Sequence, residues 1–231
     1  PPDRMAQPLE PSPPEAGTRG ALRSVPLRRD WHDARLGVAL GCTLVGVSWL
    51  LLAVTHRRVA GWERGVFHAV NDLPDSLRRF LWLPMQLGSS WAWMLALPVL
   101  VIVYRRLAPG LAVALGGWSA YLVTQGAKAL ADRPRPAALL AGVHVRTLGA
   151  SGNGYPSGHA AVAAGIIAAL VPWVGRRTRT ALWLLAGTVA FARVFFGVHL
   201  PLDVVGGAGI GLIFGTIATV LVGVPDRTNT R

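Results

Sequence analysis

The sequence is poor in charged residues, cysteine and lysine, and these shortages narrow the kind of protein it can be. Charged residues make up only 15% of the 231 residues, against about 25% in an ordinary soluble domain. The single cysteine, Cys42, excludes an intrachain disulfide framework and a cysteine-based metal cluster. Lysine occurs once, at Lys128, and every other basic side chain is arginine. Apolar residues account for 52% of the chain, and this balance indicates a membrane protein.

The net charge of +12 does not indicate a nucleic-acid-binding protein. The arginines form short clusters between long apolar stretches, as in Arg57-Arg58, Arg105-Arg106 and Arg176-Arg177, and they form no dense basic run. This pattern is typical of the loops that flank membrane spans. We therefore expect no nucleic-acid partner.

Six apolar segments come close to the length of about 20 residues that crosses a bilayer. They cover residues 36–55, 83–104, 110–130, 159–175, 181–199 and 201–224. The sequence therefore predicts an all-α fold, a polytopic membrane bundle of six transmembrane helices. Small residues line two of these segments and predict close helix packing. They are Ala160, Ala164 and Ala168 in the fourth segment and Gly207, Gly211 and Gly215 in the sixth.

A short amphipathic segment follows the first predicted span. Its apolar side chains fall on one helical face and its polar side chains on the other. The apolar set is Trp62, Val66, Phe67 and Val70, opposite Glu63, Arg64 and Asn71. The pattern predicts a short helix that lies in the membrane interface, with packing against the bundle as the alternative.

The ends of the chain are expected to be tails. Residues 1–29 hold seven of the 17 prolines and few apolar side chains, which predicts a disordered N-terminal tail. Residues 30–225 would form the six-span domain and residues 226–231 a C-terminal tail. If the N-terminal tail is cytoplasmic, thirteen of the 23 Lys and Arg residues lie on the cytoplasmic side. We therefore expect a multi-pass protein of the cell (plasma) membrane with its N-terminus in the cytoplasm.

Alternation of six spans brings four points of the chain to one face of the membrane. These points are the end of the third span, the start of the fourth, the end of the fifth and the start of the sixth. Nearly every unusual polar residue near the spans lies at one of them. The set comprises Lys128, Arg135, Ser157, Gly158, His159, Arg193, His199 and Asp203. The orientation given above places this candidate site on the extracytoplasmic face.

The residue types in this set suit a phosphate group. Three cations, two of them arginines with planar donor forks, could hold phosphate oxygens. A helix that opens at Ser157-Gly158 would offer free backbone N–H groups to an anion. Asp203, four residues after His199, could hold one ring nitrogen and leave the other free to attack.

Three blocks of these residues resemble the type-2 phosphatidate phosphatase superfamily, the lipid phosphate phosphatases that share a site with vanadium haloperoxidases. The family's Lys-x6-Arg-Pro block matches residues 128–136, and its Pro-Ser-Gly-His block matches residues 156–159 without change. The third block, Ser-Arg-x5-His-x3-Asp, matches residues 192–203, except that Ala192 stands where the family has serine. This departure removes one hydroxyl contact to phosphate, and we do not expect it to abolish activity.

The resemblance implies a membrane enzyme that hydrolyses a lipid phosphate or diphosphate through a phosphohistidine intermediate. His199 would be the nucleophile, Asp203 would orient it, and His159 would protonate the leaving group. The phosphate would be bound by Lys128, Arg135, Ser157, Gly158 and Arg193. The sequence contains no carboxylate cluster for a metal, and we expect no metal and no other cofactor.

The sequence does not choose the substrate. Polyprenyl diphosphate, a polyprenyl-phospho-sugar, phosphatidate and phosphatidylglycerol phosphate all remain candidates. A lipid phosphotransferase that uses the same site is a close alternative. A non-catalytic lipid-phosphate transporter or scaffold is another, although its polar residues would be expected along the midplane of the bundle. The expected partners are the lipid substrate and membrane lipids, and formation of a homo-oligomer is left open.

Overall fold

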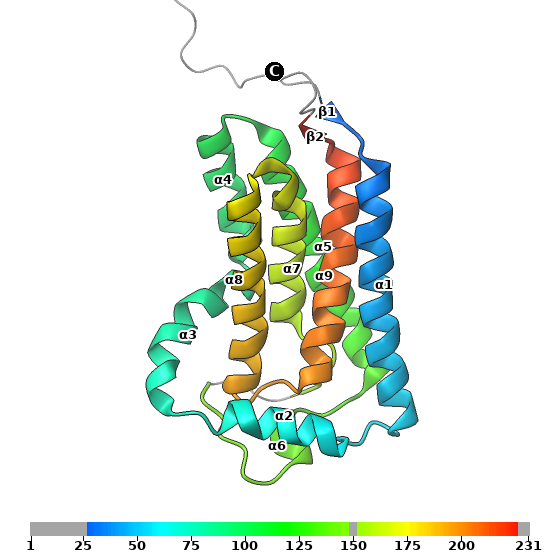
Figure 1. The fold of residues 1–231 in the computed structure, drawn as a ribbon, viewed down its shortest axis with the longest axis vertical. Helices are drawn as coiled ribbons and strands as arrows, with labels where there is room; N and C mark the ends of the chain where they lie inside the picture. Colours follow the sequence, from blue (N-terminus) through cyan, green and yellow to red (C-terminus); the bar gives the residue numbers. More distant parts are fainter. Residues whose placement is uncertain (1–26, 148–151, 226–231) are drawn as a thin grey trace, which may run out of the picture.

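Helices make up most of the residues that the computed structural model describes, which are 27–147 and 152–225. The long helices run side by side along the longest axis of the molecule (Figure 1). In chain order the helices are α1 (Trp31–Val54), α2 (Gly61–Asn71), α3 (Arg78–Met85), α4 (Ala92–Tyr104), α5 (Leu107–Ala131), α6 (Pro136–Leu139), α7 (Gly158–Leu170), α8 (Arg176–Phe195) and α9 (Pro201–Val222). Short 3-10 turns precede α3 (Asp75–Leu77), follow α3 (Gln86–Gly88) and follow α7 (Val171–Trp173).

The bundle is built around α7, which is buried along most of its length. Helices α5, α7 and α9 pack against one another, while α1 packs on α9, α4 on α5 and α8 on α7. A Cβ atom built on Gly207, Gly211 or Gly215 of α9 would collide with the backbone of α7 or of the residue before it. The glycine stripe therefore lets these two helices approach closely, as the sequence predicted.

The mostly helical fold agrees with the sequence, whereas the number of membrane spans remains a prediction. Helices lie at all six predicted positions. Three of them, α1, α5 and α9, are long and apolar enough to cross a membrane, and a fourth span is counted if the helices on either side of residue 90 form one broken span. Helix α7 is apolar but shorter, and α8 begins with three arginines within four residues.

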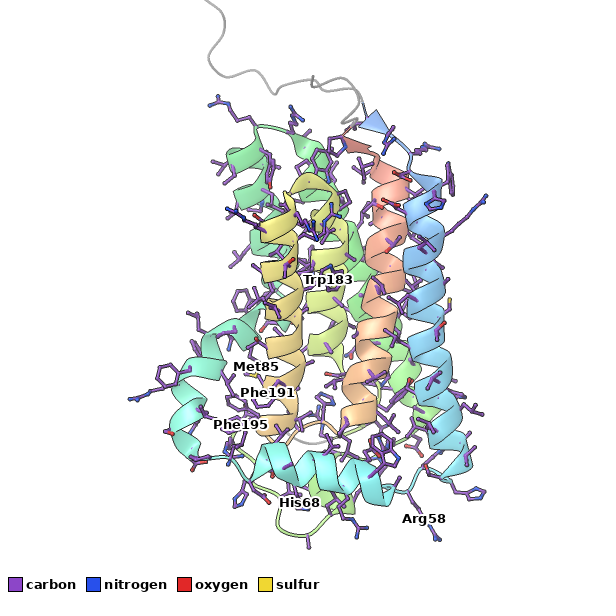
Figure 2. All side chains as sticks on the ribbon, viewed as in Figure 1. Arg58, His68, Met85, Trp183, Phe191 and Phe195 are labelled. Carbon is purple, nitrogen blue, oxygen red and sulfur yellow. The ribbon has the colours of Figure 1, made fainter. Side chains whose placement is uncertain are left out.

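The second predicted span, 83–104, is not one continuous helix. The segment Asp75–Gly88 meets α4 at an angle of 77°. Gly88, at the break, lies against α7, where an added Cβ would come within 2.5 Å of the His159 carbonyl oxygen. The break thus lets the chain turn where it passes the start of α7. On the N-terminal side of the break, α3 packs on α8 through Met85 and Phe195 (Figure 2).

Helix α2 lies across the end of the bundle, beneath α8 and α9 in Figure 1. Its predicted division into faces was wrong. The side chains that it buries are Glu63, Phe67 and Asn71, while Trp62 and Val66 are about half exposed. Glu63 and Asn71 face inward because the bundle supplies polar partners for both of them.

The opposite end of the molecule carries the only sheet among the described residues. Strand β1 (Leu27–Arg28) pairs antiparallel with β2 (Val224–Pro225) and so joins the segment before α1 to the segment after α9. Residues 27 and 28 belong to the segment predicted as an N-terminal tail. The rest of that segment up to residue 26, and the predicted C-terminal tail 226–231, lie outside the described residues.

Candidate functional site

A cavity of about 390 Å³ lies at the end of the bundle that α2 crosses. It collects residues from α3, α5, α7, α8 and the connecting loops. Six of the eight residues selected from the sequence line it, namely Lys128, Arg135, Gly158, His159, Arg193 and His199. The other two, Ser157 and Asp203, are fully buried and lie outside its lining. The structure therefore brings together selected residues that are up to 71 residues apart in sequence, from Lys128 to His199.

Lys128 is held by the loop that leads into α7. It lies in the last turn of α5, and Asp132, the residue after the helix, has a left-handed conformation. The Lys128 ammonium donates to the carbonyl oxygen of Asn153 at 3.4 Å, and the Asn153 amide donates back to the Lys128 carbonyl oxygen at 3.0 Å. This exchange fixes the end of α5 against the loop and leaves the remaining ammonium N–H groups for the cavity.

The two guanidinium groups of the cavity have unused donors. Arg135 donates to the carbonyl oxygen of Val198 at 3.4 Å, and Arg193 donates to the sulfur of Met85 at 3.4 Å. Among the described residues, the buried Nε atoms of both arginines have no hydrogen-bond partner. A buried donor without a partner costs free energy, so an anion in the cavity would stabilise both side chains.

The start of α7 forms one wall of the cavity. Ser157 caps the helix, since its hydroxyl oxygen accepts from the backbone N–H of Ala160 at 3.5 Å. A Cβ built on Gly158 would meet nothing within 4 Å, so the backbone borders open space there. A helix start with accessible backbone and a positive dipole end favours an anion.

Burial and nearby positive charges favour the neutral form of His199. Burial, followed by the charges of Arg193, Arg135 and Lys128, lowers the pKa of His199 well below its ordinary value, and a backbone contact with Gly154 only partly opposes this. Its Nδ1 atom lies 3.5 Å from the carboxylate of Asp203. That distance is long for a hydrogen bond, and such contacts often tighten only when substrate binds. His159, in the first turn of α7, lines the same cavity.

The sequence pattern did not indicate Arg133, which binds Asp203, or Glu63, which binds Arg133. Arg133 donates to Asp203 at 2.9 Å and makes two further hydrogen bonds to Glu63, of 3.1 and 2.6 Å. Arg133 lies within the first sequence block, between Lys128 and Arg135, but nothing in its spacing shows that it turns away from the cavity. Glu63 carries no local signal, because its partner lies 70 residues later in the chain.

The departure at Ala192 lies away from the cavity. Its side chain is fully buried in an apolar cluster with Met85 and Phe195, and it is absent from the cavity lining. A serine hydroxyl at this position would enter that apolar cluster in the present arrangement.

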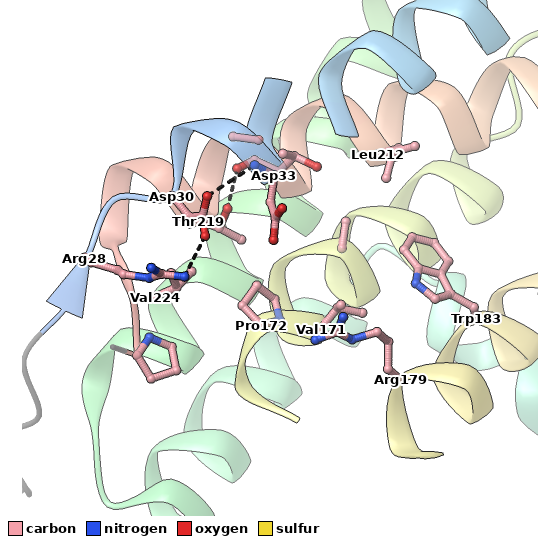
Figure 3. Close-up of a pocket in the computed structure, with 14 residues that line it drawn as sticks. Arg28, Asp30, Asp33, Val171, Pro172, Arg179, Trp183, Leu212, Thr219 and Val224 are labelled. Carbon is pink, nitrogen blue, oxygen red and sulfur yellow. Dashed lines mark hydrogen bonds and ion pairs between the residues drawn. The ribbon is translucent and has the colours of Figure 1, made fainter. Parts of the chain in front are cut away.

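A second cavity, of about 260 Å³, lies at the opposite end of the bundle (Figure 3). An ion pair of 2.9 Å joins Arg28 and Asp30 at its edge, and Arg179 and Trp183 lie on the other side. Within the described part of the chain its lining contains no histidine. It therefore lacks the combination of cations and imidazoles found at the α2 end.

Comparison with known proteins identifies a family and two similar structures. A family model described as the PAP2 superfamily matches residues 107–225. The crystal structure of Aquifex aeolicus LpxE is similar, with a TM-score of 0.62 and 28% identity over 67% of this chain and 92% of that chain. A transmembrane PAP2 type phosphatidylglycerolphosphate phosphatase from Bacillus subtilis shares the fold, with a TM-score of 0.62 and 19% identity over 78% of this chain and 94% of that chain.

No curated protein matches the chain. The family match spans slightly more than half of the sequence and contains all eight residues selected from it, together with Arg133, while Glu63 lies outside. The chain therefore belongs to the PAP2 superfamily.

Proposed function

We propose that this membrane lipid phosphatase takes the phosphoryl group of a lipid phosphate or diphosphate onto His199 and then passes it to water. One observation supports this most strongly. Lys128, Arg135 and Arg193 surround the same cavity as both histidines, and two of these cations have buried N–H groups without a partner among the described residues. This is the arrangement that an anionic substrate and an imidazole nucleophile require.

In the first step, the free Nε2 of His199 forms a bond to phosphorus while the bond from phosphorus to the leaving oxygen breaks. His159 gives its proton to that oxygen, which leaves as a lipid alcohol or, from a diphosphate, as a lipid monophosphate. In the second step, a water oxygen bonds to phosphorus while the bond from phosphorus to Nε2 of His199 breaks, and the water loses a proton to His159. Inorganic phosphate leaves, and both histidines return to their starting states.

The cations stabilise the charge that spreads over the equatorial phosphoryl oxygens. Arg135 and Arg193 offer fork-shaped donors, while the Lys128 ammonium acts as a compact point charge. The start of α7 at Gly158 adds backbone N–H groups. Phosphoryl transfer depends mainly on such positioning and charge stabilisation.

The substrate's apolar tail leaves the cavity between α3 and α5. Trp82 and Gln86 line the cavity from the α3 side, and Tyr121 and Gln125 line it from α5. Helix α3 also exposes Phe80, Trp82 and Leu83. An amphiphile can therefore place its phosphate among the cations while its tail stays beside α3 in the bilayer.

The same proposal includes the arrangement in the membrane. Helices α1, α4, α5, α7, α8 and α9 would cross the membrane, and α2 would lie at its extracytoplasmic surface beside the site. The cavity at the end of the bundle supports this, because an interfacial site suits a substrate with a polar head and an apolar tail. A transporter would instead be expected to place its binding residues near the midplane.

The test is release of inorganic phosphate by the purified protein from polyprenyl diphosphate, a polyprenyl-phospho-sugar, phosphatidate and phosphatidylglycerol phosphate. We expect release from at least one of them, insensitivity to excess chelator, and loss of release in His199→Ala. Rapid quenching should trap an acid-labile, base-stable phosphoenzyme in the wild type only. Phosphate release by His199→Ala at the wild-type rate would contradict the mechanism. Transfer of label to a second lipid would instead identify a phosphotransferase.

A further inference from the structure

We propose that Glu63 and Arg133 are positioning residues that keep a negative charge on Asp203 directed at His199. This inference rests on the proposed phosphohistidine mechanism and adds two residues to it. Neither of them lines the substrate cavity. Both would act on the reaction only through Asp203.

The three side chains form one buried cluster contributed by three separate parts of the chain. Glu63 comes from α2, Arg133 from the loop after α5, and Asp203 from the first turn of α9. All three are fully buried. One terminal nitrogen of Arg133 donates to both carboxylates, at 3.1 Å to Glu63 and 2.9 Å to Asp203, and the other donates to Glu63 at 2.6 Å.

Each carboxylate oxygen in the cluster has a definite partner. Arg133 occupies one oxygen of Asp203, and the other accepts the Leu200 backbone N–H at 2.8 Å and lies 3.5 Å from Nδ1 of His199. Glu63 also accepts the backbone N–H of Leu202 at 3.1 Å. The cluster therefore fixes the start of α9 and aims one edge of Asp203 at the imidazole.

The charge of the cluster explains why a second carboxylate is present. With both acids ionised, the two carboxylates and one guanidinium sum to one negative charge. Arg133 and Asp203 alone would form a neutral pair. Glu63 restores the negative charge, which can balance the positive imidazole ring that forms when His199 takes up the phosphoryl group. A charge buried this close to the ring is poorly screened and acts strongly.

The alternative is that this ion cluster only holds α2 in place. Several other contacts already do so. Asn71 donates to the carbonyl oxygens of His144 and Phe195, each at 3.0 Å, and accepts from the His144 backbone N–H at 2.9 Å. Phe67 is buried in an apolar cluster with Leu200 and Val204. Helix α2 is thus anchored independently of the Glu63 charge, so a charge effect can be separated from a docking effect.

The experiment compares Glu63→Gln, Arg133→Met, the double variant and Asn71→Ala with the wild type. Glu63→Gln keeps an acceptor for the Leu202 N–H but removes the charge. We expect a 10- to 100-fold fall in kcat for p-nitrophenyl phosphate with little change in KM. This is on the order of the effect of losing a single charge-stabilising group. In Arg133→Met two carboxylates face each other and share a proton, so kcat should acquire a new pH dependence. The double variant, which has one acid left, should lose that dependence. Asn71→Ala should lower the thermal midpoint while kcat stays within about 2-fold of the wild type.

Two results would overturn the proposal. One is a loss of kcat in all four variants, including Asn71→Ala, that follows their loss of thermal stability. The other is an unchanged pH profile in Arg133→Met. If the wild type hydrolyses no substrate, the proposed function fails, and vanadate affinity of the same proteins becomes the measure. Weaker vanadate binding in Glu63→Gln, with Asn71→Ala unaffected, would still support the charge role. Equal vanadate affinity in all proteins, or no vanadate binding by the wild type, would reject it.

Discussion

Three cations meet at one cavity, but a different element supports each of them. Lys128 is tied to Asn153, Arg135 to the carbonyl oxygen of Val198, and Arg193 to the sulfur of Met85. These contacts are few and long, so the cations contribute more to ligand binding than to the stability of the bundle. Removing one of them should therefore affect activity without unfolding the protein.

Replacing Lys128, Arg135 or Arg193 with alanine should lower phosphate release at least about 100-fold, the effect of losing one charge-stabilising group at a transition state. Phosphate release and the thermal midpoint are measured together. Arg179→Ala, in the cavity at the other end, is the matched control and should keep wild-type activity. Normal turnover in two of the three site variants would contradict the assignment.

The lowered pKa of His199 also makes stability depend on pH. In the folded state, burial disfavours protonation of His199, and so do the charges of Arg193, Arg135 and Lys128. The unfolded imidazole, in contrast, takes up a proton below about pH 6.5. Below this pH the unfolded state binds more protons than the folded state. The free energy of unfolding is therefore unaffected by His199 above about pH 6.5 and falls below it, by up to about 1.4 kcal/mol per pH unit. The thermal midpoint should drop more between pH 7.5 and 5.5 in the wild type than in His199→Gln. Equal drops would show that His199 is not the cause.

Much of the site could be predicted from the sequence, because the blocks fall at the ends of helical segments, and six of the eight selected residues line one cavity. Glu63 and Arg133 could not be predicted in the same way. An acid on a short amphipathic helix and an arginine in a charged loop both look solvated when read locally. Only the three-dimensional arrangement shows that they pair over 70 residues and are fully buried.

At the scale of the elements, the main surprise is the break before α4. The run 83–104 contains Pro84, Gly88 and Pro98, and these residues do not show where a bend falls, since α4 continues through Pro98. At the bend Gly88 lies against His159, which comes 71 residues later in the chain. A local pattern cannot contain that information. The faces of α2 were misjudged for the same reason, since buried partners determine them.

The close contact at Gly88 predicts that a larger side chain there would displace either His159 in α7 or the chain that leads into α4. In Gly88→Ala the new methyl group would come within 2.5 Å of the His159 carbonyl oxygen, so His159 or the helix break must shift. A displacement of about 1 Å in a catalytic group can cost on the order of 100-fold in rate, and we expect a loss of that size in phosphate release. Gly65→Ala is the control, because a Cβ there meets nothing within 4 Å. Equal activity of the two variants would show that the contact is not needed.

At the scale of the whole molecule, the two ends of the bundle differ in chemistry. The site, α2 and the loop 140–147 lie at one end, and the β1–β2 pair lies at the other (Figure 1). Arg105 and Arg106 lie in the connection between α4 and α5, and three more arginines lie in the first turn of α8, both at the β1–β2 end. Basic residues favour the cytoplasmic side, so this end should face the cytoplasm. Two arginines at the site end, Arg133 and Arg146, form ion pairs with acids and therefore count less in that comparison.

This orientation can be tested with single cysteines at the two ends. In a Cys42→Ser background, Val145→Cys places a thiol on the exposed loop beside the site, and Thr178→Cys places one on the exposed first turn of α8. Intact cells treated with a membrane-impermeant thiol reagent should label the first variant and not the second. After the cells are opened, both variants should react, which controls for accessibility. Labelling of Thr178→Cys alone in intact cells would place the site in the cytoplasm, and the substrate would then be a lipid phosphate of the inner leaflet.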